Sequence, residues 1–338
     1  MIITKTPFRM SFFGGGTDLP EFFNRHGGGS VISTTFDKFC YVTVRHLPPF
    51  FKYTTELSYA RIERVKSIEK IKHPAVRHAM KMLDMHELRI TYEADLPART
   101  GLGTSSSFAV GLLNAFHALK GKEVDKRKLA DEAIKLERQL CKEAGGWQDQ
   151  IAASFGGFNR IDFADKNYTV TPLAINEDRK RRLNQNLLLF FTGFTRSSAE
   201  VQQVIKQSLR QKIAQYKAML SLVDNAQAVL LDDSRDLDDF GRLLNETWLL
   251  KTQTSSKVST DLIDEIYNKG IHAGALGGKL LGAGGGGFML FYVQPEYQEA
   301  VKAAMKKLLY VPFEFDNDGT QIIYDSPEVF NTAFMREK

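Results

Sequence analysis

The stretch that decides the fold is LPARTGLGTSSS, residues 96–107, which leads straight into a helix-like segment, residues 105–119. It contains the turn Gly101-Leu102-Gly103, followed by consecutive hydroxyl side chains from Thr104 to Ser107. Unpaired backbone N–H groups and the positive end of the helix dipole favour an anion at such a helix start. The hydroxyls add donors for phosphate oxygens and oxygen ligands for Mg²⁺, which is a hard cation. The pattern predicts a phosphate-binding loop; the alternative is an extended Ser/Thr cap on an ordinary core helix.

Two further glycine clusters lie far from this loop in the chain. One is Gly14-Gly15-Gly16, which Arg9 and Asp18 bracket, and the other occupies residues 277–287. Glycine weakens regular elements, so such clusters mark places where the backbone turns tightly or approaches a ligand. Three clusters, each beside a predicted strand or helix, together favour a phosphate cradle.

The common nucleotide-binding motifs do not explain these clusters. A Walker loop needs Gly-Lys followed by Ser or Thr, whereas Gly278-Lys279 is followed by Leu280. Residues 282–287 match the dinucleotide fingerprint by letters, but the predicted strand follows these glycines instead of preceding them. The triplet Asp239-Phe240-Gly241 lies in a helix-like stretch and precedes the candidate glycine-rich loop, which argues against a protein kinase.

Two acidic residues are candidates for chemistry. Glu137 lies between Ala133 and Leu140 on the apolar face of a predicted helix, residues 125–142. A carboxylate there is costly unless a cation or a metal pairs with it, and the alternative is a glutamate at the edge of the stripe that reaches solvent. Asp149 lies in a glycine-flanked, largely uncharged segment, which favours a partly desolvated acid that contacts a hydroxyl group.

Local patterns predict most of the remaining elements. Alternating or β-branched runs predict strands at residues 39–44, 88–93, 187–191 and 288–293, and long helices are expected at 198–229 and 237–250. The basic run Arg179-Lys180-Arg181-Arg182 is predicted to be a solvated turn.

The size and composition indicate an ordinary globular protein. The chain has 338 residues, of which 43% are hydrophobic and 25% charged, so two domains are expected. A polar, turn-rich segment, residues 159–171, suggests domains at 1–165 and 166–338. A net charge of +5 is too diffuse for nucleic acid but suits a small anionic substrate.

The composition also bears on the compartment. Cys40 and Cys141 form neither a disulfide framework nor a metal motif, which favours a reducing cytoplasm. No apolar run approaches the ~18–20 residues that cross a bilayer, and the N-terminus does not match a secretory signal, so we expect no membrane contact.

In their order along the chain, these motifs resemble those of the GHMP kinase superfamily, which includes galactokinase, homoserine kinase and mevalonate kinase. The first motif is PFRMSFFGGGTD (residues 7–18), the second is residues 97–107, and the third is KLLGAGGGG (residues 279–287). Residues 146–150, GWQDQ, are similar to the segment that carries the catalytic aspartate of the sugar kinases. The resemblance implies an α+β, two-domain GHMP kinase fold, with a ribosomal S5 domain 2-like N-terminal domain and a ferredoxin-like C-terminal domain.

Within the superfamily, FGGGTD followed by GGWQDQ is similar to the branch of D-glycero-D-manno-heptose 7-phosphate kinases. That branch uses ATP to phosphorylate the C1 hydroxyl, giving a 1,7-bisphosphate for nucleotide-activated heptose. Gly15 and Gly16 stand where galactokinase has Glu and His, which argues against galactose. The alternatives are a kinase for a free sugar such as L-fucose and a non-catalytic sugar-sensing homologue. The resemblance leaves a homodimer open.

The resemblance also implies residue roles. Asp149 would accept or orient the proton of the sugar hydroxyl, and Arg9 would keep Asp149 ionised. Ser105, or the neighbouring Thr104, would hold Mg²⁺ together with Glu137. ATP phosphates would be bound by Pro97, Gly101, Leu102, Gly103, Thr104, Ser105, Ser106 and Ser107. The sugar phosphate would be bound by Gly15, Gly16, Thr17, Asp18, Gly146 and Arg196. The third glycine loop would close over the reactants through Gly282, Gly284, Gly285 and Gly286.

Overall fold

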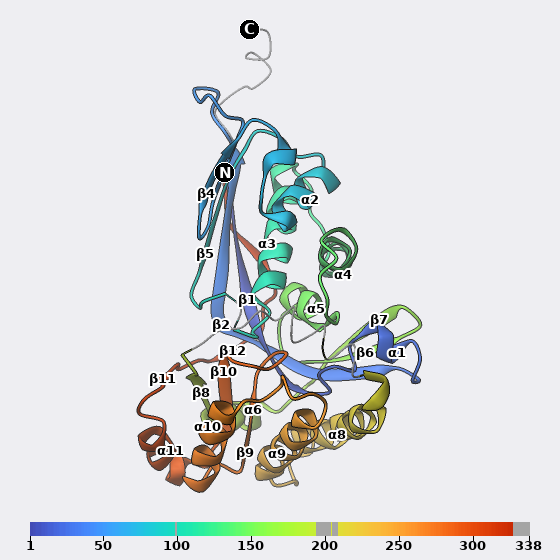
Figure 1. Ribbon diagram of the computed structural model, residues 1–338, viewed down its shortest axis with the longest axis vertical. Coiled ribbons are helices and arrows are strands. Elements are labelled where there is room, and N and C mark those ends of the chain that lie inside the picture. Colours follow the sequence, from blue (N-terminus) through green and yellow to red (C-terminus); the bar gives the residue numbers. More distant parts are fainter. Residues whose placement is uncertain (99, 194–203, 205–208, 327–338) are drawn as a thin grey trace.

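The computed structural model describes residues 1–98, 100–193, 204 and 209–326. Within these residues the chain forms a nine-stranded sheet and a four-stranded sheet, each with its own helices, and the two lie at opposite ends of the long axis (Figure 1). The expected mixture of α and β structure is therefore confirmed. Arg196, expected to contact substrate, lies outside the described residues.

The larger sheet has the strand order β13-β1-β2-β5-β3-β4, and β12 and the β6–β7 hairpin also pair with β2. Its strand pairs are antiparallel except for the parallel pair β3–β5. The strands are β1 (Ile2–Phe13), β2 (Gly29–His46), β3 (Thr55–Ser58), β4 (Ile62–Val65), β5 (Leu88–Ala94), β6 (Asn159–Ala164), β7 (Asn167–Pro172), β12 (Phe315–Asp316) and β13 (Gln321–Asp325).

Helices α2 to α5 cover one face of this sheet (Figure 1). The helix α3 packs against β1 and β2, and its apolar side chains share a core with Val42, Ile90 and Leu129. The helical segments of this half are α1 (Pro20–Phe23), the 3₁₀ turn η1 (Ile68–Lys70), α2 (Pro74–Met82), α3 (Thr104–Leu119), α4 (Lys126–Ile134), the π-helical η2 (Lys135–Leu140) and α5 (Gln148–Phe155).

The smaller sheet is antiparallel, with the order β11-β8-β10-β9. Its strands are β8 (Leu187–Phe191), β9 (Gly277–Leu280), β10 (Phe288–Tyr292) and β11 (Leu309–Tyr310). The accompanying helices are α6 (Glu177–Gln185), η3 (Leu209–Gln211), α8 (Ile213–Leu231), α9 (Asp238–Thr252), α10 (Asp261–His272), η4 (Pro295–Tyr297) and α11 (Gln298–Ala304). None of the helices in the described part of the chain is long and apolar enough to span a bilayer.

One apolar core joins the two halves. The C-terminal end of β1 inserts Phe12 and Phe13 among residues of the smaller half, and the ring of Phe12 lies 5.3 Å from that of Phe240, centroid to centroid. Leu290 of β10 belongs to the same core. Because β1 runs from one half into the other, polar residues near its end lie at the junction of the two halves.

Two segments differ from the local prediction. Residues 159–171 were expected to be a turn-rich boundary but form the hairpin β6–β7, because β6 finds its partner in the distant strand β2. The basic run 179–182 lies in helix α6 and not in a turn. Arg181 and Arg182 are exposed as expected, but Arg179 is buried and its guanidinium donates to the Val229 carbonyl (2.6 and 3.0 Å).

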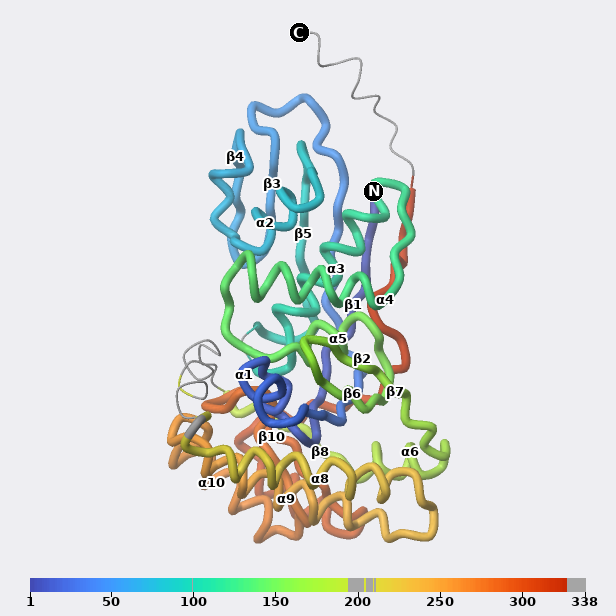
Figure 2. Tube along the Cα trace, turned by 90° about the vertical axis from the view of Figure 1, so that its right-hand side faces the viewer, coloured from blue at the N-terminus to red at the C-terminus, as the bar shows by residue number. Residues whose placement is uncertain are grey.

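The sheets also divide the chain differently from the expected domains 1–165 and 166–338. Residue 165 lies in the turn of the β6–β7 hairpin. The last described strands leave the smaller half and return to the larger sheet, where β12 pairs with β2 and β13 pairs with β1; Figure 2 shows β13 beside the N-terminal strand. The return depends on pairing across the whole length of the chain, which no local pattern encodes.

Candidate active site

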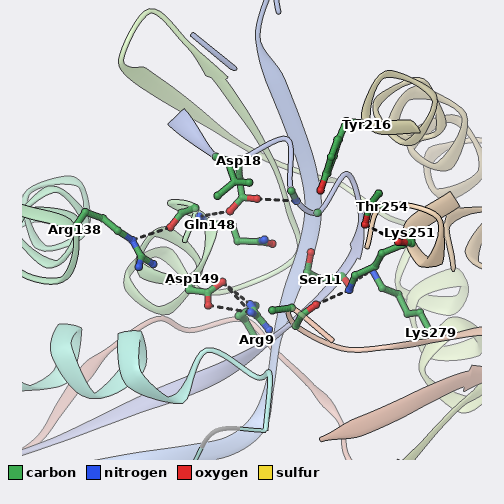
Figure 3. A pocket seen from close by; sticks show the side chains of 16 residues that line it. Arg9, Ser11, Asp18, Arg138, Gln148, Asp149, Tyr216, Lys251, Thr254 and Lys279 are labelled. Carbon is green, nitrogen blue, oxygen red and sulfur yellow. Dashed lines mark hydrogen bonds and ion pairs between the residues drawn. The ribbon is translucent and has the colours of Figure 1, made fainter. Parts of the chain in front are cut away.

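A pocket lies where the end of β1, the start of α5 and the segments around α9 and β9 meet (Figure 3). Gly15, Gly16 and Gly146, three of the residues expected to bind substrate, contribute to its wall. Its cationic side chains outnumber its anionic ones, which suits an anionic ligand. The charged residues that line it are Arg9, Asp18, Arg138, Asp149, Lys251 and Lys279.

Arg9 and Asp149 form a bidentate ion pair in this pocket. Nε of Arg9 donates to Oδ1 of Asp149 (2.9 Å) and Nη2 donates to Oδ2 (3.0 Å), a geometry that fixes both side chains. Asp149 lies in the first turn of α5, where the helix dipole favours a carboxylate. Arg9 also donates through Nη1 to the carbonyl of Gly101 (2.7 Å), so one guanidinium connects the acid to the second glycine cluster.

Asp18 is a second, more deeply buried acid, with 3% of its surface exposed. The amide of Gly16 donates to its Oδ1 (2.9 Å) and the amide of Gln148 donates to its Oδ2 (3.3 Å). Burial raises the pKa of Asp18, the charge of Asp149 adds to this rise, and the two amides oppose it. The two carboxylates therefore share one pocket but have different environments.

Thr17 has a role other than the expected contact with substrate. Its buried hydroxyl donates to the carbonyls of Gly14 (2.8 Å) and Ser30 (3.0 Å) and accepts from the Ser30 amide (3.0 Å). These bonds commit the hydroxyl to the turn after β1, and Thr17 does not contribute to the wall of the pocket. Thr17 thus supports the turn that positions Gly16 and Asp18.

The start of α3 meets Glu137, as the resemblance implied. Gly103, the N-cap of α3, adopts a left-handed conformation (φ 74°), which turns the chain into the helix. The hydroxyls of Ser105 and Ser106 donate to Oε1 (2.8 Å) and Oε2 (2.6 Å) of Glu137, and the Gln150 amide also donates to Oε2. Glu137 is 1% exposed, so the alternative of a solvent-facing glutamate is wrong.

The helix that carries Glu137 is not regular. It was expected to run from residue 125 to 142; Asp125 does cap α4 through the amide of Lys128 (2.8 Å), but the last turns are π-helical. Such turns often occur at functional sites. No group of three acidic, His or Cys side chains converges in the described ranges, so Mg²⁺ beside Glu137 would take further oxygens from phosphates and water.

Other members of the expected nucleotide loop contribute through the backbone or hold the loop in place. The Ser107 hydroxyl donates to the Pro7 carbonyl (2.8 Å) and is buried, so it is not free to bind phosphate. The Leu102 carbonyl accepts from the Arg9 amide (3.2 Å), and the Pro97 carbonyl accepts from the Thr100 hydroxyl (2.9 Å). Thr104 begins α3 and is largely buried.

The third glycine cluster lies directly on the second. A Cβ on Gly282 would lie 2.3 Å from Cα of Gly101, and one on Gly101 would lie 2.4 Å from the Leu281 carbonyl oxygen. Only glycine permits this approach of two backbones. Gly284 and Gly285 approach Val258, whose carbonyl accepts from the Gly285 amide (3.0 Å), and Gly286 follows in the same loop between β9 and β10.

Two buried lysines in the pocket were not expected from the sequence. Lys251 of α9 and Lys279 of β9 are 8% and 2% exposed. Burial, and then the charge of Arg9, lowers the pKa of Lys251 to about 8. Lys279 is the one charged residue of β9, whose other residues are glycine and leucine, and this isolated charge was the available signal.

The comparisons with known proteins agree with this geometry. Residues 68–157 match the model of the GHMP kinase N-terminal domain, and residues 223–311 match that of the GHMP kinase C-terminal domain. The D-glycero-alpha-D-manno-heptose 7-phosphate kinase of Campylobacter jejuni is 31% identical over 95% of this chain and 98% of its own. The chain therefore belongs to the GHMP kinases, and it is an ATP-dependent sugar kinase.

Two more relatives place it within the family. The L-fucokinase/L-fucose-1-P guanylyltransferase of Bacteroides fragilis is 30% identical, over 66% of this chain and 23% of its own. A solved D-glycero-D-manno-heptose 1-phosphate kinase from Bacteroides thetaiotaomicron superimposes with a TM-score of 0.78, covering 97% of this chain and 100% of that one at 24% identity. The expected two-domain GHMP kinase fold is thus confirmed.

Proposed function

We propose that the protein transfers the γ-phosphoryl group of ATP to the C1 hydroxyl of D-glycero-D-manno-heptose 7-phosphate, giving the 1,7-bisphosphate. The observation that carries the proposal is the ion pair of Arg9 and Asp149, which lines the pocket and is bonded to the turn at Gly101. The choice of sugar is supported by the similarity to the Campylobacter jejuni enzyme, which extends over nearly the whole of both chains.

Asp149 accepts the proton of the C1 hydroxyl as that oxygen bonds to the γ-phosphorus, while the bond from the γ-phosphorus to the leaving ADP oxygen breaks. Arg9 holds the Asp149 carboxylate in one orientation and offsets charge on the transferred group. Asp18 and the backbone of Gly15 and Gly16 bind hydroxyl groups of the sugar. Positioning and electrostatics provide most of the acceleration in such a reaction.

Glu137 and Ser105 would hold Mg²⁺ beside the nucleotide. The Glu137 carboxylate is buried and has only uncharged donors among the described residues, so a cation fits there. Bound Mg²⁺ would neutralise charge on the phosphates. Ser105 is an exposed residue, and its hydroxyl, which already contacts Glu137, would supply a second oxygen.

Asp149→Asn tests the proposed base. It keeps the size of the side chain but removes the proton acceptor, so kcat should fall by a factor of about 10² or more while the affinity for ATP stays nearly unchanged. ADP release measures kcat, and calorimetric titration with a non-hydrolysable ATP analogue measures affinity. Asp162→Asn is the matched control, because Asp162 also pairs with an arginine, Arg160 (2.8 Å), away from the pocket.

A kcat close to that of the wild type in Asp149→Asn would overturn the assignment of the base. The substrate itself is tested by comparing heptose 7-phosphate with free heptose and L-fucose, and by phosphorus NMR of the product. A clear preference for a neutral sugar would overturn the heptose phosphate proposal in favour of a free-sugar kinase.

A further inference from the structure

Lys251 and Lys279 come from different elements and reach the same pocket. Figure 3 shows both on the side of Arg9 that lies away from Asp149. The pocket they line also contains Gly15, Gly16 and Asp18. It contains neither Glu137 nor residues 103–107 at the start of α3. The lysines therefore share a pocket with the residues expected to bind the sugar, and Gly282 and Ala283 of the third glycine loop line it as well.

Each ammonium group has a hydrogen-bond donor to spare. Nζ of Lys279 donates to the carbonyls of Ser11 (2.8 Å) and Phe12 (2.7 Å). Nζ of Lys251 donates to the carbonyls of Leu280 (3.4 Å) and Gly282. An ammonium group carries three N–H donors, so one donor of each lysine has no partner among the described residues.

The positive charges of the lysines also lack a counterion. Within the described residues neither Nζ has a carboxylate at ion-pairing distance, and the two acids of the pocket are engaged, Asp149 by Arg9 and Asp18 by two amides. Burial, then Lys251, then Arg9 lower the pKa of Lys279 well below its ordinary value. A buried, unpaired cation is costly, and an anionic ligand would offset this cost.

Ser11 gives independent evidence for a ligand at the same place. Its side chain is 5% exposed and lines the pocket, and its Oγ has no hydrogen-bond partner in the part of the chain that the structure describes. Buried hydroxyls are normally paired, so an unpaired one in a pocket indicates an acceptor supplied from outside. The backbone carbonyl of Ser11 is one of the two that hold Lys279.

We propose that Lys251, Lys279 and Ser11 form a subsite for the phosphate group that the sugar substrate already carries. This inference rests on the proposed function, because it requires a phosphorylated sugar as the acceptor. Two ammonium groups and a hydroxyl match a phosphate dianion in charge and in donors. The subsite makes the enzyme select a sugar phosphate over the same sugar without phosphate.

The test compares kcat/KM for heptose 7-phosphate and for heptose without phosphate in the wild type and in Lys251→Met, Lys279→Met and Ser11→Ala. Lys251→Met should lower kcat/KM for the sugar phosphate by about 10- to 100-fold, the range for a lost hydrogen bond between charged groups. The ratio of kcat/KM for heptose 7-phosphate to kcat/KM for heptose should fall by a similar factor. KM for ATP should change far less. Lys251→Arg, which keeps the charge, should retain most of the ratio. Lys269→Met is the matched control, since Lys269 is an exposed lysine of α10 paired with Glu265.

The outcomes separate the subsite from the proposed function. A wild-type enzyme without preference for the phosphorylated sugar would overturn the proposed function and the subsite together. A wild-type preference that persists in Lys251→Met and Lys279→Met would overturn the subsite alone. If the Met variants lose kcat/KM equally for both sugars, the lysines serve the fold and the subsite is overturned. If the variants instead raise KM for ATP, the lysines serve the nucleotide and the subsite is again overturned. If the Met variants do not fold, the ratio in Ser11→Ala decides, and an unchanged ratio would overturn the subsite.

Discussion

Gly146→Ala should damage the sugar site through Asp18 without touching the nucleotide loop. A Cβ on Gly146 would lie 1.8 Å from Oδ2 of Asp18 and 2.2 Å from its Cγ. The backbone of Gly146 is not in the left-handed region, so alanine is conformationally acceptable there and the conflict is purely steric. The Asp18 carboxylate must therefore move.

The size of the effect follows from what holds Asp18 in place. Its carboxylate accepts from the amides of Gly16 (2.9 Å) and Gln148 (3.3 Å), and hydrogen bonds to a charged group contribute about 1.5–3 kcal/mol each. Since rotation can preserve part of this network, we expect a loss of about 2–4 kcal/mol in transition-state stabilisation. That corresponds to a decrease in kcat/KM for the sugar of about 30- to 1,000-fold.

A double-mutant cycle of Gly146 and Asp18 tests whether the added methyl group acts through the Asp18 carboxylate. ADP release under varied sugar concentration gives kcat/KM for Gly146→Ala, Asp18→Ala and the double variant. If the methyl group acts through Asp18, it should have little further effect once Asp18 is alanine. Additive losses in the double variant would refute the mechanism.

Two further predictions concern the metal and the pH. Glu137→Gln should raise the Mg²⁺ concentration for half-maximal activity by about tenfold or more, measured by titration of ADP release; an unchanged Mg²⁺ dependence would contradict the assignment. Lys251 faces Arg9, Lys279 and Asp18, and its pKa is lowered to about 8, so it is protonated below pH 8 and loses its charge above it. KM for the sugar phosphate should therefore rise as the pH passes 8, and Lys251→Arg should remove this rise; a KM independent of pH between 7 and 9 would contradict it.

Elements with a strong local pattern were predicted close to their observed bounds. The helix expected at 105–119 is α3 (Thr104–Leu119), and the strand expected at 187–191 is β8. Asp125 caps α4 as its position before an amphipathic segment indicated. In these elements the residues that set the element's type and bounds lie within a few positions of each other. Local composition and spacing are therefore enough to predict them.

Elements whose partners lie far along the chain were misread. Residues 159–171 have turn-like composition, yet pairing of β6 with β2 makes them a hairpin. Arg179 belongs to a highly basic run, yet it is buried. Its burial is tolerated because its guanidinium donates to the Val229 carbonyl. A distant partner overrides local propensity when it satisfies the backbone or the charge.

The motifs alone were enough to identify the family, and they singled out the start of α3, Glu137 and Asp149 as candidate site residues, because glycine turns and buried carboxylates leave a local signature. Only the folded chain showed that the hydroxyls of Thr17 and Ser107 are committed to backbone carbonyls. Only the folded chain brought Lys251 and Lys279 to one pocket. The function of a hydroxyl or an ammonium group depends on which partners surround it, and here those partners lie in segments up to hundreds of residues away.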